Sequence, residues 1–404
     1  MKINLIRFAN SIDPNAPYLK DSESFINDIN DELFDRDLCL EEKAEDACFS
    51  VIFIETGGSE QKFVKEYANL PRPIVLLSHC KNNSLPACME IKTYVEAHKE
   101  SAVLVFGDEK MASKSLYALS KVMVAKKELE AIKAGVIGEP SDWLIASRVD
   151  YQEVKRVFGV ELIDITIDEL KSEIEKEVDF DIPHLVLLKE KTFDKDVLDG
   201  AIKIYCGLKR IVNKYSLKGF TLRCFDLLSE YKNTACLAFA LLNEEGIVAA
   251  CEGDVPSLLT MLIINAATKF PSFMANPSRI DINKSTMLFA HCTLPLNMCK
   301  KYTLMTHFES GLGIGVRGEL EKKEVTVVKV APNLKDILCV KGEIIDNPNL
   351  EGYCRTQITV KFDVEEMFDF LKDSFGNHVL IAYGDIADQI LTIHNFLLDV
   401  NKIN

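Results

Sequence analysis

Hydrophobic positions in the first third of the chain alternate between two patterns. Short β-rich runs at residues 3–9, 50–55, 73–78 and 102–107 are separated by segments with the period of amphipathic helices. Such alternation predicts a parallel sheet with helices on both faces. A long helix over residues 109–133 stops at Ala134-Gly135, so we place the end of a first α/β domain at residue 134.

The middle of the chain repeats this alternation on a smaller scale. Strands at residues 136–138, 160–165 and 220–224 alternate with helices at 151–158, 168–177, 194–215 and 234–242. The pattern predicts a second small α/β domain over residues 135–245.

The pattern changes again after residue 245. A strand at 247–251 and a helix at 255–267 are followed by β-rich segments at 286–291, 325–331, 337–345 and 354–362, with hairpin-like spacing. We therefore expect a third domain, residues 246–404, that is mixed and largely antiparallel. The predicted fold class is α/β, with two Rossmann-like layers followed by this β-rich domain.

Composition narrows the class of protein. The 404 residues are 48% hydrophobic and 27% charged, which is typical of a globular protein, and no run approaches the ~18 apolar residues of a membrane helix. The N-terminus lacks the pattern of a signal peptide, and the twelve cysteines include no Cys-x-x-Cys pair, so we expect reduced thiols and a cytoplasmic protein. A net charge of -15 disfavours nucleic acids and anionic membranes as partners.

Three glycines match a dinucleotide-binding pattern without its structural context. Gly313, Gly315 and Gly318 are followed by residues 319–324, which run into a strand rather than a helix. A pyrophosphate site needs a helix N-terminus after the glycines. We therefore interpret the segment as a loop or hairpin.

Two segments of the third domain carry candidate chemistry. Glu252 and Asp254 lie where a strand ends and a helix begins, an edge at which α/β proteins often place ligands. His378 precedes another strand-like run. Two carboxylates and an imidazole suit Mn²⁺ or another divalent cation. The alternative is structural, with Asp254 as a helix cap and His378 as a hydrogen-bonded loop residue.

Several segments resemble the L-fucose/L-arabinose isomerase superfamily, and in particular the L-fucose isomerase-like proteins. They are residues 138–147, 158–162, 251–254, 290–293 and 376–378, and the resemblance spans most of the chain. It implies the fold of L-fucose isomerase and a metal-dependent aldose-ketose isomerisation through an enediol. It also implies a homo-oligomer in which the N-terminal domain of a neighbouring subunit contributes to the pocket.

The resemblance also implies roles for individual residues. Asp254 and His378 match two of the family's metal ligands, and Glu252 is the expected base that moves a proton between C1 and C2. The third metal ligand, a glutamate, falls opposite residues 230–236, where Cys236 is the closest match. Glu230 or Glu252 is an alternative for this ligand, or the ligand is absent. The expected metal ligands are therefore Glu252, Asp254 and His378, and the expected catalytic residues are Glu252 and Asp254.

Five further residues are candidates for binding the sugar. We expect Arg223, His291, His307 and Asn377 to orient hydroxyl groups and Trp143, the single tryptophan, to stack on the sugar ring. Structural roles are the alternative for each.

Two other functions stay open from the sequence. The first is a non-catalytic carbohydrate-binding or regulatory paralogue, which is motivated by Cys236. The second is another metal-dependent carbohydrate reaction, such as epimerisation or aldol cleavage, which shares the enediolate.

Overall fold

The computed structural model describes residues 1–10 and 17–400, and the chain divides into two compact units. The first unit comprises Met1–Lys127 and Asn395–Asn404, and the second comprises Glu128–His394. Within the described ranges, no helix is both long and apolar enough to cross a membrane.

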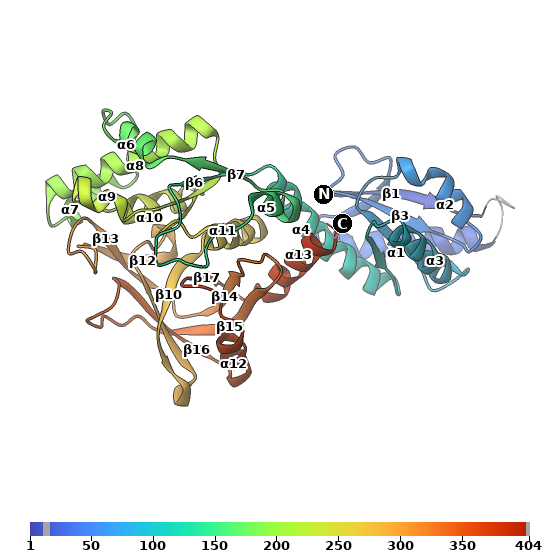
Figure 1. Ribbon diagram of the computed structural model, residues 1–404. Coiled ribbons are helices and arrows are strands. Elements are labelled where there is room, and N and C mark those ends of the chain that lie inside the picture. The colour runs from blue at the N-terminus through green and yellow to red at the C-terminus, as the bar shows by residue number, and fades with distance from the viewer. Residues whose placement is uncertain (11–16, 401–404) are drawn as a thin grey trace. The chain divides into compact units, whose positions relative to one another are not determined.

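A five-stranded parallel sheet forms the centre of the first unit (Figure 1). Its order is β2-β1-β3-β4-β5, and buried side chains fill β3 and β4, as expected for central strands covered on both faces. The strands are β1 (Lys2–Phe8), β2 (Cys39–Glu42), β3 (Ser50–Ile54), β4 (Ile74–Leu77) and β5 (Ala102–Val105). The helices are α1 (Pro17–Phe34), α2 (Glu60–Glu66), η1 (Tyr67–Asn69), α3 (Ser84–Ala97) and α4 (Glu109–Glu130), the last of which continues into the second unit.

The second unit contains a four-stranded parallel sheet in the order β7-β6-β8-β9. Its strands are β6 (Lys133–Ile137), β7 (Glu161–Ile165), β8 (Gly219–Leu222) and β9 (Val248–Ala250). The helices that connect and follow them are α5 (Tyr151–Phe158), α6 (Ile167–Ile174), α7 (Leu185–Lys191), α8 (Lys195–Tyr215), α9 (Asp226–Tyr231) and α10 (Cys236–Glu244).

The same unit contains a closed antiparallel barrel in the order β10-β11-β16-β15-β14-β17. Its interior is filled by apolar side chains such as Phe273, Phe289 and Ile381. The strands are β10 (Phe273–Asp281), β11 (Thr286–His291), β14 (Glu324–Val330), β15 (Ile337–Asp346), β16 (Thr356–Phe362) and β17 (Val379–Tyr383). The predicted fold class is confirmed, but closure of the antiparallel strands into a barrel was not expected.

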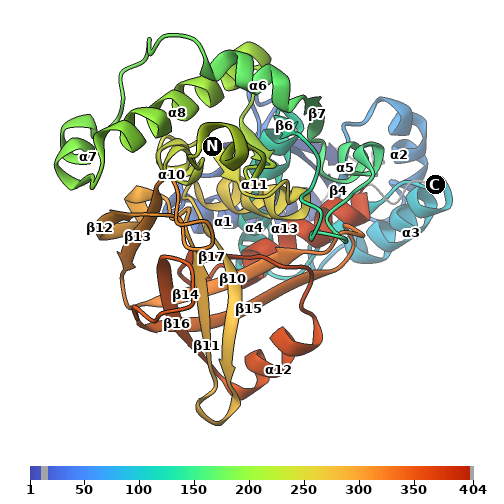
Figure 2. The ribbon, with the colours of Figure 1, turned by 60° about the vertical axis from the view of Figure 1, so that its left-hand side comes forward.

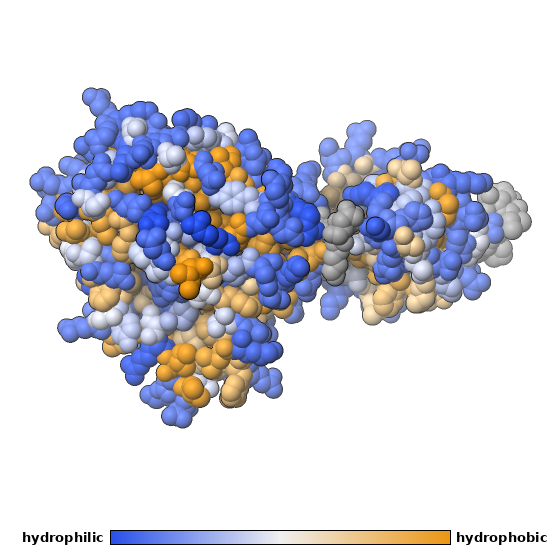
Figure 3. Space-filling view, in the orientation of Figure 1, coloured by the Kyte–Doolittle hydropathy of each residue, from blue (hydrophilic) through white to orange (hydrophobic). Residues whose placement is uncertain are grey.

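Smaller elements surround the barrel. They are η2 (Ile282–Lys284), η3 (Leu296–Met298), the antiparallel pair β12 (Cys299–Met305) and β13 (Gly315–Leu320), and the helix α12 (Val364–Lys372). Helix α13 (Ala387–Val400) follows the last barrel strand and continues into the first unit. Gly315 and Gly318 lie within β13, which agrees with the hairpin interpretation of the glycine pattern. The long β10–β11 hairpin projects from the barrel in Figure 2. Hydrophobic side chains are exposed on this hairpin and on α12, at the lower end of the unit in Figure 3.

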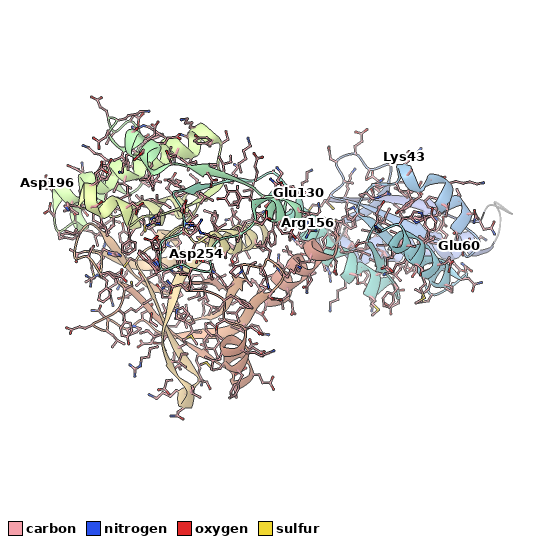
Figure 4. All side chains as sticks on the ribbon, in the orientation of Figure 1. Lys43, Glu60, Glu130, Arg156, Asp196 and Asp254 are labelled. Atoms are coloured by element: carbon pink, nitrogen blue, oxygen red, sulfur yellow. The ribbon has the colours of Figure 1, made fainter. Side chains whose placement is uncertain are left out.

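Helix α11 (Val255–Thr268) lies between the parallel sheet and the barrel and contacts β8, β9, β14 and β17 (Figure 1). Its residues are apolar on every side, as expected for a helix buried between two layers. Asp254 caps its N-terminus by accepting a hydrogen bond from the backbone N–H of Ser257, and Pro256 occupies the first turn. Asp254 is fully buried in the interior of the unit, at the position labelled in Figure 4.

Candidate functional site

Loops from the parallel sheet and from the barrel meet around a cavity of about 490 Å³, a size that suits a small molecule. The segments that follow β6, β8 and β9 contribute Trp143, Cys224 and Glu252. The barrel contributes His291 at the end of β11 and Asn377 before β17. The whole cavity belongs to the second unit.

A tight turn between β9 and α11 fixes Glu252. Its backbone has a φ of +63°, and that of Gly253 is +76°. A Cβ atom at Gly253 would lie 2.6 Å from the carbonyl oxygen of Glu139, so only glycine fits this position. The turn therefore holds the carboxylate of Glu252 at one place on the cavity wall.

The carboxylate of Glu252 faces three nitrogen atoms. Trp143 Nε1 donates a hydrogen bond to Oε2 at 2.6 Å, and Oε1 lies 3.5 Å from His378 Nε2 and 3.8 Å from His291 Nε2. Burial by itself raises the pKa of Glu252, but the nearby imidazoles of His291 and His378 outweigh it and hold the pKa well below its usual range. The carboxylate is therefore ionised.

His378 links Glu252 to the interior. It is fully buried, and its Nδ1 donates to Asp254 Oδ2 at 2.9 Å. Its Nε2 makes no hydrogen bond within the described part of the chain. Burial alone would lower the pKa of His378, but the two carboxylates outweigh it and raise the pKa to about 9.

Asp254 is held from behind by Lys329 of β14. Lys329 Nζ lies 3.2 Å from Oδ1 and 3.0 Å from Oδ2, and Ser257 donates from its backbone N–H and its hydroxyl at 2.9 and 2.8 Å. Burial raises the pKa of Asp254, but the charges of Lys329 and His378 bring it below its usual range. Both oxygens are engaged, so Asp254 orients His378 and presents no free lone pair to the cavity.

The buried ligand atoms fit a metal ion. The side chains of Cys251, Glu252 and His291 each offer one ligand atom within 4.8 Å of the others. His378 Nε2 adds an unpartnered nitrogen beside Glu252 Oε1, and a metal that binds there would displace its proton, because the raised pKa keeps this imidazole charged. One carboxylate with two imidazoles is a common set for divalent transition metals. Burial lowers the pKa of His291, which favours the neutral imidazole that a metal requires.

The sugar-binding candidates divide into two groups. Trp143, His291, His307 and Asn377 line the cavity. The side chain of Arg223 is directed elsewhere: it binds the carboxylate of Asp142 at 3.0 and 3.1 Å, that of Asp226 at 3.1 Å and the carbonyl oxygen of Pro140 at 3.2 Å. Arg223 therefore stabilises the loop that carries Trp143.

The structure also distinguishes the residues considered for the glutamate ligand that the resemblance implies. Glu230 forms an ion pair with Lys171 at 2.5 Å and is about half exposed, and it does not line the cavity. Cys236 at the start of α10 is buried and does line it. Of these two residues, only Cys236, with its thiol, lines the cavity.

Three features of the site did not follow from the sequence reasoning. For Lys329 there was one indication in the sequence, because it is the single charged residue in the apolar run Val327-Val328-Lys329-Val330. Glu309 lines the cavity from the loop after β12. In the sequence, only its closeness to His307 pointed to it. Five of the twelve cysteines also line the cavity, and their scattered spacing gave no hint of it: Cys224, Cys236, Cys251, Cys292 and Cys354.

Buried carboxylate and imidazole groups around a cavity of this size make it the candidate site for a small polar substrate. The chain matches no protein-family model. It is similar to the sulfoquinovose isomerase of Alkalicoccus urumqiensis, with 25% identity over 77% of this chain and 74% of the relative. It is also similar to those of Priestia aryabhattai, with 22% identity over 78% and 74%, and of Clostridium sp. (strain MSTE9), with 23% over 81% and 78%. These similarities agree with the prediction of an isomerase that acts on a sugar.

Proposed function

We propose that the protein is a metal-dependent aldose-ketose isomerase of the L-fucose isomerase type. The observation that carries this proposal is the group formed by Glu252 Oε1, His291 Nε2 and His378 Nε2, which meet beside a cavity of about 490 Å³. The similarity to sulfoquinovose isomerases over most of both chains supports the same reaction class.

The metal, Mn²⁺ or another divalent cation, would be held by Glu252, His291 and His378. Its contribution when bound would be to polarise the carbonyl and adjacent hydroxyl of the sugar. Asp254, which the sequence suggested as a ligand, acts here through His378, because its hydrogen bond to Nδ1 turns Nε2 toward Glu252.

Proton transfer falls to Glu252. Its carboxylate is ionised and lines the cavity, so we assign to it the transfer of a proton from one carbon of the sugar to the neighbouring carbon of the enediol. Trp143 Nε1 holds one oxygen in place through a charge-assisted hydrogen bond. His307 and Asn377 line the cavity at positions suited to sugar hydroxyls, and the Trp143 ring offers an apolar face.

The substrate class is a free sugar of pentose to hexose size. The sulfonated sugar that names the relatives belongs in the panel of candidates, together with 6-deoxyhexoses and pentoses. A cytoplasmic location and a homo-oligomer stay predictions from the sequence.

The experiment is a conversion assay with controlled metal content. Protein stripped with a chelator and protein reloaded with Mn²⁺ are incubated with the sugar panel, and the sugars are separated by chromatography. We expect conversion of at least one aldose to its ketose by the reloaded protein and loss of conversion in Glu252→Gln. If no sugar is converted by protein whose metal content is verified, the proposal fails.

One observation favours a second candidate, a carbohydrate-binding protein without activity. Cys236 lies in the cavity wall where the resemblance places a carboxylate. Thermal shift separates the two candidates, since a binding protein is stabilised by its sugar even after metal removal. Metal-independent stabilisation without conversion would favour this second candidate.

A further inference from the structure

Two thiols touch at the edge of the cavity. Cys224 Sγ and Cys251 Sγ lie 3.2 Å apart, both residues are buried, and both line the cavity. Both cysteines are free. A disulfide needs an S–S distance of about 2.05 Å, so its formation requires movement of roughly 1 Å.

The backbone brings these thiols together. Strands β8 and β9 are neighbours in the parallel sheet, with Thr221 opposite Ala250. Cys251 directly follows β9, and Cys224 lies two residues beyond the end of β8. The contact is therefore built into the sheet and does not depend on a mobile loop.

Movement of Cys251 would be transmitted to Glu252. The two residues are adjacent, and the turn that follows is tight because Glu252 and Gly253 both have positive φ and Gly253 packs against Glu139. A shift of about 1 Å in a catalytic group is enough to lose most activity. Oxidation of Cys251 would therefore displace the carboxylate from His291 and His378.

We propose that Cys224 and Cys251 form a reversible disulfide that switches off the site, with a hydroperoxide as the oxidant. One thiol attacks the peroxide, the O–O bond breaks, and a sulfenic acid and water are formed. The second thiol then attacks the sulfenic sulfur, the S–S bond forms, and a second water leaves. Two thiols lose two electrons and two protons in total, and a dithiol reverses the change.

The position of the pair determines when it reacts. Both residues line the cavity that takes the sugar under the proposed function, so a small peroxide would reach them where the substrate enters. Bound sugar should therefore protect the thiols. Burial also makes the reaction slower than at an exposed thiol such as Cys80.

The experiment follows cross-linking and activity together. Metal-loaded protein is treated with increasing hydrogen peroxide, free thiols are alkylated, and peptides are mapped by mass spectrometry. We expect a 224–251 cross-link that rises in parallel with loss of activity, recovery of activity with dithiothreitol, and slower cross-linking in the presence of the converted sugar.

Matched variants identify the pair responsible. For each variant, the activity that remains after peroxide treatment is divided by the activity of the same variant before treatment. Differences in initial activity between variants therefore do not affect the result. Cys224→Ala should resist peroxide at least tenfold better than the unaltered protein. Cys354→Ala, which removes the partner of Cys292 in the other thiol contact of the cavity, should be as sensitive as the unaltered protein.

The outcomes separate this inference from the proposed function on which it rests. Equal sensitivity of Cys224→Ala, or inactivation without the 224–251 cross-link, would overturn the switch. If the protein converts no sugar, the readout becomes Mn²⁺ affinity measured by calorimetry before and after oxidation. A cross-linked protein that binds Mn²⁺ as tightly as the reduced protein would also overturn it.

Discussion

Lys329 Nζ lies 3.0 Å from Asp254 Oδ2, and both side chains are almost completely buried. The pair joins β14 of the barrel to the N-terminus of α11, and Asp254 in turn orients His378. Burial lowers the pKa of Lys329 while the charge of Asp254 opposes that effect. The ion pair thus connects the stability of the fold to the geometry of the site.

Removal of the lysine charge should destabilise the protein strongly. In Lys329→Met the buried carboxylate of Asp254 loses one of its two cationic partners and keeps only His378, which costs up to about 3–5 kcal/mol. The free energy of unfolding from urea denaturation measures this loss. Lys341→Met is the control: it removes an exposed ion pair with Asp385 and should change stability by less than about 1 kcal/mol. Similar stability of the two variants would contradict a structural role for the buried pair.

Metal affinity should distinguish the residues that bind the ion from Asp254, which only orients His378. We expect His378→Ala and Glu252→Gln to lose Mn²⁺ binding, because both remove a ligand atom. Asp254→Asn, combined with Lys329→Met to keep the buried charge balanced, should weaken binding about 10–100-fold. Isothermal titration calorimetry gives the three affinities. If the Asp254 variant loses binding as completely as Glu252→Gln, Asp254 is itself a ligand.

Trp143→Phe tests the hydrogen bond to Glu252. Phenylalanine keeps an aromatic ring beside Phe225 but loses the Nε1–H that donates to Oε2. A hydrogen bond to a charged group contributes about 1.5–3 kcal/mol, so kcat/KM should fall roughly 10–100-fold. Steady-state kinetics on the converted sugar provides the measurement. An unchanged kcat/KM would show that the bond does not position the base.

His307 should make the protein sensitive to acid. Burial, aided by repulsion from His291, lowers its pKa from 6.5 to about 4. The unfolded chain therefore takes up a proton between these pH values and the folded chain does not, so stability present above pH 6.5 falls as the pH drops toward 4. His307→Gln should lose less thermal stability over this range than the unaltered protein. Parallel pH profiles of the melting temperature would contradict this assignment.

The charge of the cavity should select against an anionic sugar. Two carboxylates, Glu252 and Glu309, line it, and the described lining residues include no lysine or arginine. We expect kcat/KM for 6-deoxyglucose to exceed that for sulfoquinovose, which carries a sulfonate on the same skeleton, by about tenfold or more. Glu309→Gln should narrow this ratio. Preference for the sulfonated sugar in the unaltered protein would show that a cation from elsewhere reaches the site.

Local periodicity was sufficient to predict most of the layers. Helices α5 and α8 and strand β11 fall within a residue of the predicted bounds, because their patterns and caps are local. The closed barrel was not predictable, since it depends on pairing of β10 with β17, about a hundred residues later in the chain.

The sequence could indicate candidate residues for the site but not the contacts between them. The sequence selected Glu252, Asp254 and His378, and the structure places them in one chain of contacts. The role of Lys329 could not be derived from the sequence. Its partner Asp254 lies at the start of α11, and the two residues meet only when the barrel packs against that helix. The ion pairs of Arg223 with Asp142 and Asp226 could not be derived either, because folding alone brings these residues together.

Exchange with solvent deuterium tests the proposed reaction most directly. The metal-loaded protein is incubated in D₂O with its substrate, and mass spectrometry or NMR follows deuterium at C2 of the aldose and C1 of the ketose. Proton transfer by Glu252 predicts incorporation by the unaltered protein and a fall of at least about 10²–10⁴-fold in Glu252→Gln, which lacks the base. Ketose formation without deuterium, or undiminished exchange in Glu252→Gln, would contradict this mechanism.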